Sequence, residues 1–75
     1  MILPSKHIDL QHSLLGAGAA ILRNLEQPQS VTTLWSQVHD LPEIGYYDRF
    51  ILTLDFLFAI GAIGFKDRTI AKNQQ

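Results

Sequence analysis

The sequence predicts a mainly α-helical domain in which three helices are followed by a small C-terminal β-hairpin. Two observations support this fold class. Apolar residues recur at helical spacing in three segments, which Pro28 and Pro42 separate, and a short alternating apolar stretch follows the third segment. A chain of 75 residues has room for one domain, so we expect residues 1–75 to fold together around a small core.

The first helix is expected to begin near Ser13 and to end before Pro28. Residues 1–11 are predicted to be extended, because Pro4 disfavours the helical conformation in the residue before it. After Ser13, apolar and small residues gather on one side of a helical wheel, which indicates an amphipathic helix. These residues are Leu14, Leu15, Gly18, Ile21, Leu22 and Leu25.

The second and third helices are bounded by turn residues. Residues 28–31 form a connector, after which Thr32 is a candidate N-cap, because a hydroxyl there accepts from the free amides of the next turn. The second helix is expected to end at Pro42. Its inward stripe consists of Leu34, Trp35, Val38 and Leu41. The third and longest helix is predicted over residues 47–60, with Gly61 closing it in the left-handed conformation.

The remaining stretch predicts the hairpin. Ile63 and Phe65 alternate with small residues, and a polar break at residues 66–68 precedes the β-favouring pair Thr69–Ile70. Residues 72–75 are polar and are expected to fray. This order of elements is that of a winged helix-turn-helix: a helix, a short helix after a turn, a long helix, and a hairpin that forms the wing. A plain three-helix bundle with a disordered tail is the alternative.

Composition narrows the classes of function. Charged residues make up 17% of the chain, below the roughly 25% of an ordinary soluble domain, and the net charge is −1. This balance provides no global positive field of the kind that attracts nucleic-acid phosphates. The N-terminus lacks the pattern of a signal peptide, and the most apolar run, residues 50–65, is shorter than the roughly 20 residues of a membrane span. We expect a cytoplasmic protein without a membrane segment.

No residue pattern indicates catalysis or a bound cofactor. The small residues at positions 16–20 lack the preceding strand and the Gly-Lys-Ser/Thr ending of a phosphate-binding loop, and they favour a close helix crossing instead. The chain has no Cys, and His7, His12 and His39 are not spaced to share a helix face. No local motif combines a nucleophile with a base and an orienting group. We therefore expect no metal, no cofactor and no enzymatic activity.

The third helix would enter the major groove if the domain bound DNA, but its charges oppose that use. Its charged residues are Asp48, Arg49 and Asp55, which give a net charge of −1 on the surface that would approach phosphate. Arg49 alone is left for reading bases. In the wing, the candidates for a weak phosphate contact are Lys66, Arg68 and Lys72.

The outer side of the third helix is apolar. A helical wheel places the core on the side of Phe50, Ile51, Leu54, Leu57 and Phe58. Leu52, Phe56 and Ile60 form a second stripe on the outer side, which Arg49 and Thr53 flank and which Tyr46 and Tyr47 extend. Two explanations remain open. Either the N-terminal segment or the wing covers the stripe, or the stripe is an exposed interface for a protein partner.

Four segments resemble a known family. They are Met1-Ile2-Leu3-Pro4-Ser5-Lys6-His7-Ile8, Ser13-Leu14-Leu15-Gly16-Ala17-Gly18-Ala19, Thr33-Leu34-Trp35 and Leu52-Thr53-Leu54-Asp55-Phe56-Leu57-Phe58-Ala59-Ile60-Gly61-Ala62-Ile63. In order and in length they resemble the short middle component, of the class numbered six, of bacterial ABC three-component systems. The resemblance covers nearly the whole chain.

This resemblance implies a winged-helix-like adaptor encoded between an SMC/Rad50-like ABC ATPase and a third component, in systems that act in conflict with phage or other mobile DNA. ATP hydrolysis would then belong to the ATPase partner, and the resemblance supplies no catalytic or metal-binding residues. Two alternatives stay open beside the adaptor. One is a small DNA-binding regulator, and the other is a homo-oligomer in which the apolar stripe pairs with itself.

Overall fold

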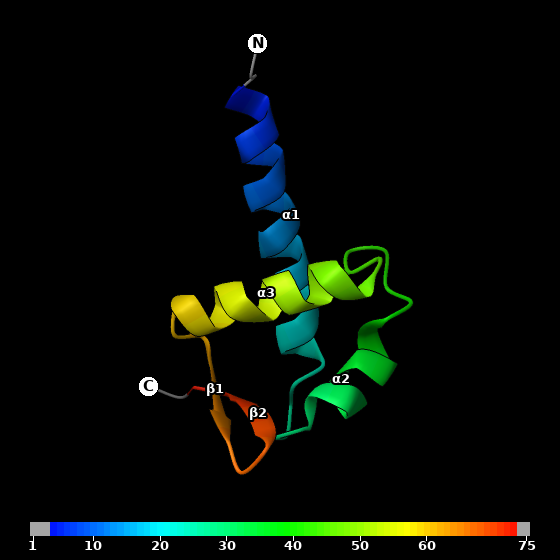
Figure 1. Ribbon diagram of the computed structural model, residues 1–75, viewed down its shortest axis with the longest axis vertical. Coiled ribbons are helices and arrows are strands. Elements are labelled where there is room, and N and C mark those ends of the chain that lie inside the picture. The colour runs from blue at the N-terminus through cyan, green and yellow to red at the C-terminus, as the bar shows by residue number, and fades with distance from the viewer. Residues whose placement is uncertain (1–3, 74–75) are drawn as a thin grey trace.

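Three helices and a two-stranded hairpin make up the fold. The computed structural model describes the backbone of residues 4–73 and the side chains of residues 14–73. The elements are α1 (Pro4–Arg23), α2 (Val31–Val38), α3 (Tyr47–Ala59), β1 (Ile63–Lys66) and β2 (Thr69–Lys72). Helix α3 crosses α1, and α2 and the hairpin lie below opposite ends of α3 (Figure 1). The predicted fold class, mainly α with a C-terminal hairpin in the winged-helix order, is confirmed.

Helix α1 begins earlier than the sequence predicted. It is helical from Pro4, so the extended conformation expected for residues 1–11 is wrong over residues 4–11, and residues 1–3 lie outside the described part. The physical reason is that proline is well suited to the first turn of a helix, where its missing N–H would have no intrahelical acceptor. Pro4 therefore starts the helix. The helix ends at Arg23, before Pro28 as predicted.

Ser30, rather than Thr32, caps α2. The Ser30 backbone is extended, and its Oγ accepts a hydrogen bond from the Thr33 amide at 3.1 Å, which satisfies one free donor of the first turn. Thr32 lies inside that turn and is exposed. The helix is also shorter than expected: it ends at Val38, four residues before Pro42.

Helix α3 ends at the predicted glycine in a Schellman motif. Gly61 has a φ of +78°, its amide donates to Phe58 O at 3.0 Å, and the Ala62 amide donates to Leu57 O at 2.9 Å. These two bonds satisfy carbonyls that the helix end leaves free. The reversal sends the chain directly into β1.

The hairpin turns at Asp67 and Arg68, which both have positive φ as in a two-residue type I′ turn. Gln29 in the α1–α2 connector pairs with the hairpin through two backbone hydrogen bonds. The Gln29 amide donates to Ile70 O at 3.0 Å, and the Ile70 amide donates to Gln29 O at 2.6 Å. The sequence predicted only a connector at this position. The bridge gives the hairpin a third, strand-like neighbour and fixes it against the helices.

The end of the hairpin is better ordered than the predicted frayed tail. Lys72 belongs to β2, and the Asn73 side chain donates to Gly61 O at 2.9 Å and to Ile63 O at 3.2 Å. Residues 72 and 73 are therefore held in place, which corrects the expectation for them. Residues 74–75 lie outside the described part.

The core lies where the three helices and the hairpin meet. Its buried apolar residues are Ala17, Ala20, Ile21, Leu25, Leu34, Val38, Ile44, Phe50, Leu54, Leu57, Ile63 and Ile70. The buried face of α3 is rotated from the helical-wheel prediction. Thr53, expected on the outer flank, is fully buried and donates from Oγ1 to Arg49 O at 2.7 Å, whereas Phe58, expected in the core, is exposed.

Gly18 is the point at which α1 and α3 approach each other. A Cβ placed on Gly18 would lie 3.1 Å from Leu57 Cδ2 and 3.9 Å from Thr53 Cγ2. This contact turns Thr53 and Leu57 toward α1 and explains the rotation of α3. It also confirms the interpretation of the small residues as a close helix crossing.

Substitution of Gly18 by leucine is expected to lower the free energy of unfolding by about 1–3 kcal/mol, because the new side chain must displace Leu57 from a packed contact. Gly16 is the matched control, since nothing lies within 4 Å of a Cβ placed there. Gly16→Leu should raise the free energy of unfolding by roughly 0.5–1 kcal/mol through helix propensity. Urea denaturation measures the free energy of unfolding of both variants. Equal changes in the two variants would contradict a close helix crossing at Gly18.

The capping assignment predicts a second pair of variants. Ser30→Ala should lower the free energy of unfolding by about 1 kcal/mol, because the Thr33 amide loses its acceptor. Thr32→Ala should change it by less than about 0.5 kcal/mol, since exposed substitutions away from such contacts have small effects. Thermal and urea unfolding measure the two changes in the free energy of unfolding. A larger change for Thr32→Ala than for Ser30→Ala would identify Thr32 as the N-cap.

Candidate partner-binding surface

The outer stripe of α3 is only partly open to solvent. Leu52 is 46% exposed and Ile60 59% exposed, so neither the hairpin nor any other described element covers them. Phe56 is half-buried and packs against the core. Of the three predicted residues, the structure therefore leaves Leu52 and Ile60 exposed and Phe56 partly buried.

A cluster of aromatic rings joins α2 to the start of α3. The ring of Trp35 lies 5.1 Å from that of Tyr47 in an edge-to-face arrangement, 5.1 Å from that of Phe50 and 5.7 Å from that of His39, measured between centroids. Phe50 is buried, whereas Tyr47 is 49% exposed and His39 is exposed. The cluster thus runs from the core to the surface.

Sequence reasoning missed two members of this cluster. The sequence predicts Trp35 on the inward stripe of α2 and predicts no functional role for His39. His39, the C-cap of α2, follows Trp35 by four residues, and this spacing was the available signal because i and i+4 side chains lie on the same face. What the spacing did not show is that Tyr47 of the next helix reaches the same ring.

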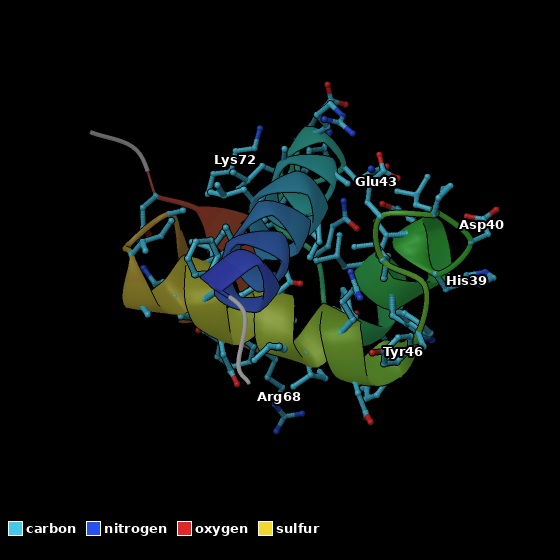
Figure 2. All side chains as sticks on the ribbon, turned by 90° about the horizontal axis from the view of Figure 1, so that it is seen from above. His39, Asp40, Glu43, Tyr46, Arg68 and Lys72 are labelled. Atoms are coloured by element: carbon cyan, nitrogen blue, oxygen red, sulfur yellow. The ribbon has the colours of Figure 1, made fainter. Side chains whose placement is uncertain are left out.

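Tyr46 directly precedes α3 and lies on the same side of the molecule as His39 (Figure 2). It occupies the N-cap position without a side-chain capping hydrogen bond, and its ring is 58% exposed. The guanidinium carbon of Arg49 lies 5.7 Å from the centre of that ring, within range of a cation–π interaction. We call Trp35, His39, Tyr46 and Tyr47 the aromatic face.

Acidic residues accompany the aromatic face. Residues 31–60 carry four acids, Asp40, Glu43, Asp48 and Asp55, against the single Arg49, a net charge of −3. Asp40, Glu43 and Asp48 are exposed, and Figure 2 shows Asp40, Glu43, His39 and Tyr46 on the same side of the molecule.

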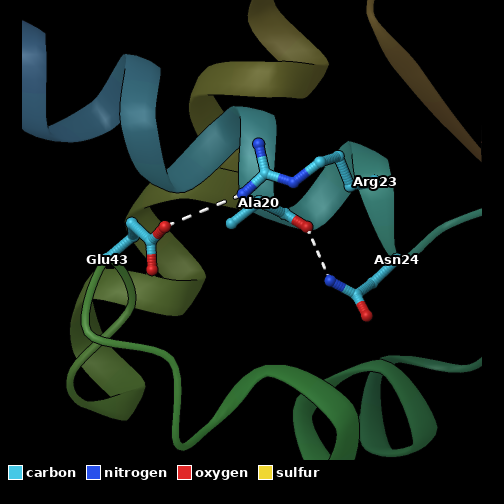
Figure 3. Close-up of polar contacts among 4 residues, drawn as sticks. All are labelled: Ala20, Arg23, Asn24 and Glu43. Atoms are coloured by element: carbon cyan, nitrogen blue, oxygen red, sulfur yellow. Dashed lines mark hydrogen bonds and ion pairs between the residues drawn. The ribbon is translucent and has the colours of Figure 1, made fainter.

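One of these acids also links the helices. A carboxylate oxygen of Glu43, in the loop before α3, lies 3.7 Å from Arg23 Nη2 at the end of α1, in an exposed ion pair (Figure 3). Beside it, the Asn24 side-chain amide donates to Ala20 O at 2.9 Å and closes the last turn of α1. The long separation and exposure of the ion pair limit its contribution to stability.

The three basic residues predicted to contact phosphate do not form one patch. Lys66 pairs with Thr69 next to the turn, and Lys72 pairs with the buried Ile63 at the opposite end of the ladder. Because side chains alternate between faces along a strand, the two lysines project from opposite faces of the hairpin. Figure 2 shows Arg68 and Lys72 on different sides of the molecule.

Other surface features are less distinctive. A polar hollow of about 340 Å³ lies between the end of α1 and α2, lined by Arg23, Asn24, Glu26, Gln27, Gln29, Thr33 and Gln37. The Gln29 Oε1 atom is buried there without a hydrogen-bond partner. Within the described residues, no group of three His, Cys, Asp or Glu side chains is placed to hold a metal ion, and no helix is long and apolar enough to cross a membrane.

Comparison with known proteins identifies the family. A family model described as "ABC-three component (ABC-3C) system Middle Component 6" matches residues 3–72. Searches of curated proteins and of solved structures gave no match. Because the match spans nearly all of the domain, from the start of α1 to the end of β2, this chain belongs to the middle component 6 family of ABC three-component systems.

Proposed function

We propose that this chain is a non-catalytic, cytoplasmic adaptor that links an SMC/Rad50-like ABC ATPase to the third component of its system, in conflict with phage or other mobile DNA. The observation that carries the proposal is the exposed apolar and aromatic surface of α3 and its entry. Leu52, Phe56 and Ile60 form one part of this surface, and Tyr46, Tyr47 and Arg49 form the other.

The composition of this surface is that of a protein interface. Exposed Leu52 and Ile60 add apolar area that water disfavours, and contiguous apolar area of this kind marks association sites. Tyrosine and arginine are enriched among residues that carry most of the binding energy at interfaces. A middle component of a multi-component system requires such contacts, and family membership and surface chemistry support the same proposal.

DNA binding and self-association are the competing functions. The net negative charge of residues 31–60 opposes the approach of phosphate, and the hairpin lysines project from different faces, which weakens the case for DNA. Retarded migration of duplex DNA at low salt would favour a regulator. Self-association would appear as twice the 8.4 kDa mass in light scattering.

Co-expression with the ATPase and the third component of the same system tests the adaptor. The wild-type chain should co-purify with the ATPase, and Leu52→Asp should weaken the complex about tenfold or more, because it places a charge in an apolar contact. Leu15→Asp is the matched control, since Leu15 is a similarly exposed leucine on α1. It should bind within about twofold of the wild type. If the wild type and both variants bind the ATPase with equal affinity, the α3 surface is not part of the interface.

A further inference from the structure

We infer that the aromatic face binds a lysine- or arginine-bearing segment of the ATPase partner, through cation–π contacts with the tyrosines and ion pairs with the surrounding carboxylates. This inference rests on the proposed function and adds the chemistry of the partner segment to it. Three observations lead to it: the position of Tyr46, the exposure of the rings and the charge around them.

Tyr46 occupies the N-cap position of α3, where a small polar residue would stabilise the helix better. The N-cap of a helix prefers Ser, Thr, Asp or Asn, whose side chains accept from the free amides, and tyrosine makes no such bond here. The Tyr46 backbone is extended, with φ −150° and ψ 168°, so a serine would fit without a backbone change. A residue that breaks a local rule and leaves a large ring in solvent is typical of a functional site.

The tyrosine rings are available to a cation. Tyr46 is 58% exposed and Tyr47 is 49% exposed. The Arg49 guanidinium lies 5.7 Å from the Tyr46 ring centre, within cation–π range, and Tyr46 remains exposed beside it. Trp35 and Phe50 hold Tyr47 in place from the core side, so its ring is pre-organised and loses little conformational entropy on binding.

The charge at this end of the molecule specifies the sign of the partner. Asp40 lies in the turn after α2 and Asp48 in the first turn of α3, and both are exposed. Figure 2 shows Asp40 on the same side of the molecule as His39 and Tyr46. With Glu43 in the loop between, three carboxylates stand against two arginines, Arg49 and the Arg23 that pairs with Glu43, which leaves a net charge of −1. A basic segment gains attraction from this rim, whereas an acidic segment or a phosphate backbone is repelled.

Tyr46→Ser separates binding from folding. It removes the ring and installs a preferred N-cap, so the urea midpoint should stay the same or rise while affinity for the ATPase falls about fivefold or more. Phe65→Ser is the matched control, because Phe65 is a similarly exposed ring on the hairpin, 57% exposed. It should bind within about twofold of the wild type. Unchanged affinity in Tyr46→Ser would overturn the inference.

The charge is tested with the double variant Asp40→Asn/Asp48→Asn. Its affinity for the ATPase should fall about threefold to tenfold at low salt, and the difference should shrink as salt rises, because exposed ion pairs are screened. Glu26→Gln/Asp67→Asn removes the same charge from exposed positions outside residues 31–60 and should have less than a twofold effect. Equal effects of the two double variants would overturn the inference.

The outcomes distinguish this inference from the proposed function. If the wild-type chain binds neither component of its system, the adaptor itself is wrong. If the wild-type chain binds the ATPase while Tyr46→Ser and Asp40→Asn/Asp48→Asn bind it as tightly as their control variants, the adaptor function stands. In that case the inference of a basic partner segment is wrong. If light scattering shows oligomers that the same variants dissociate, the basic hairpin of a second copy occupies the aromatic face, and the inference fails.

Discussion

The close approach of α1 and α3 at Gly18 is the contact on which the rest of the structure depends. With no side chain at this position, Leu57 and Thr53 pack directly against α1. That contact sets the rotation of α3 about its own axis, which in turn decides which of its apolar residues are buried and which are left outside. Leu52 and Ile60 remain exposed because Thr53 and Leu57 take the inner positions.

Features governed by neighbouring residues were predictable from the sequence. Gly61 ends α3 because the left-handed conformation suits glycine, and the hairpin follows from alternation around a polar turn. The errors arose where one residue type fits two structures. Pro4 can precede an extended segment or open a helix, and Ser30 and Thr32 carry the same hydroxyl, so only the path of the backbone decides between them.

The candidate surface shows a sharper limit. A helical wheel correctly placed Leu52 and Ile60 outside, because both stay on the outer side after the rotation of α3. The burial of Thr53 depends on the opposite helix, and the contact of Trp35 with Tyr47 depends on how the loop between α2 and α3 turns. Those are tertiary contacts between segments, for which one sequence contains no direct pattern. The order of three helices and a hairpin follows from the sequence, whereas the tertiary contacts decide which aromatic and acidic residues are exposed.

The bridge between Gln29 and Ile70 has a consequence for the order in which this protein becomes functional during its synthesis. Ile70 is fully buried, and its backbone closes the connector between α1 and α2, so the two helices made first cannot complete their core until residue 70 has been made. The hairpin therefore completes the core, and α3 can present its surface to a partner only after the hairpin has been made and has folded.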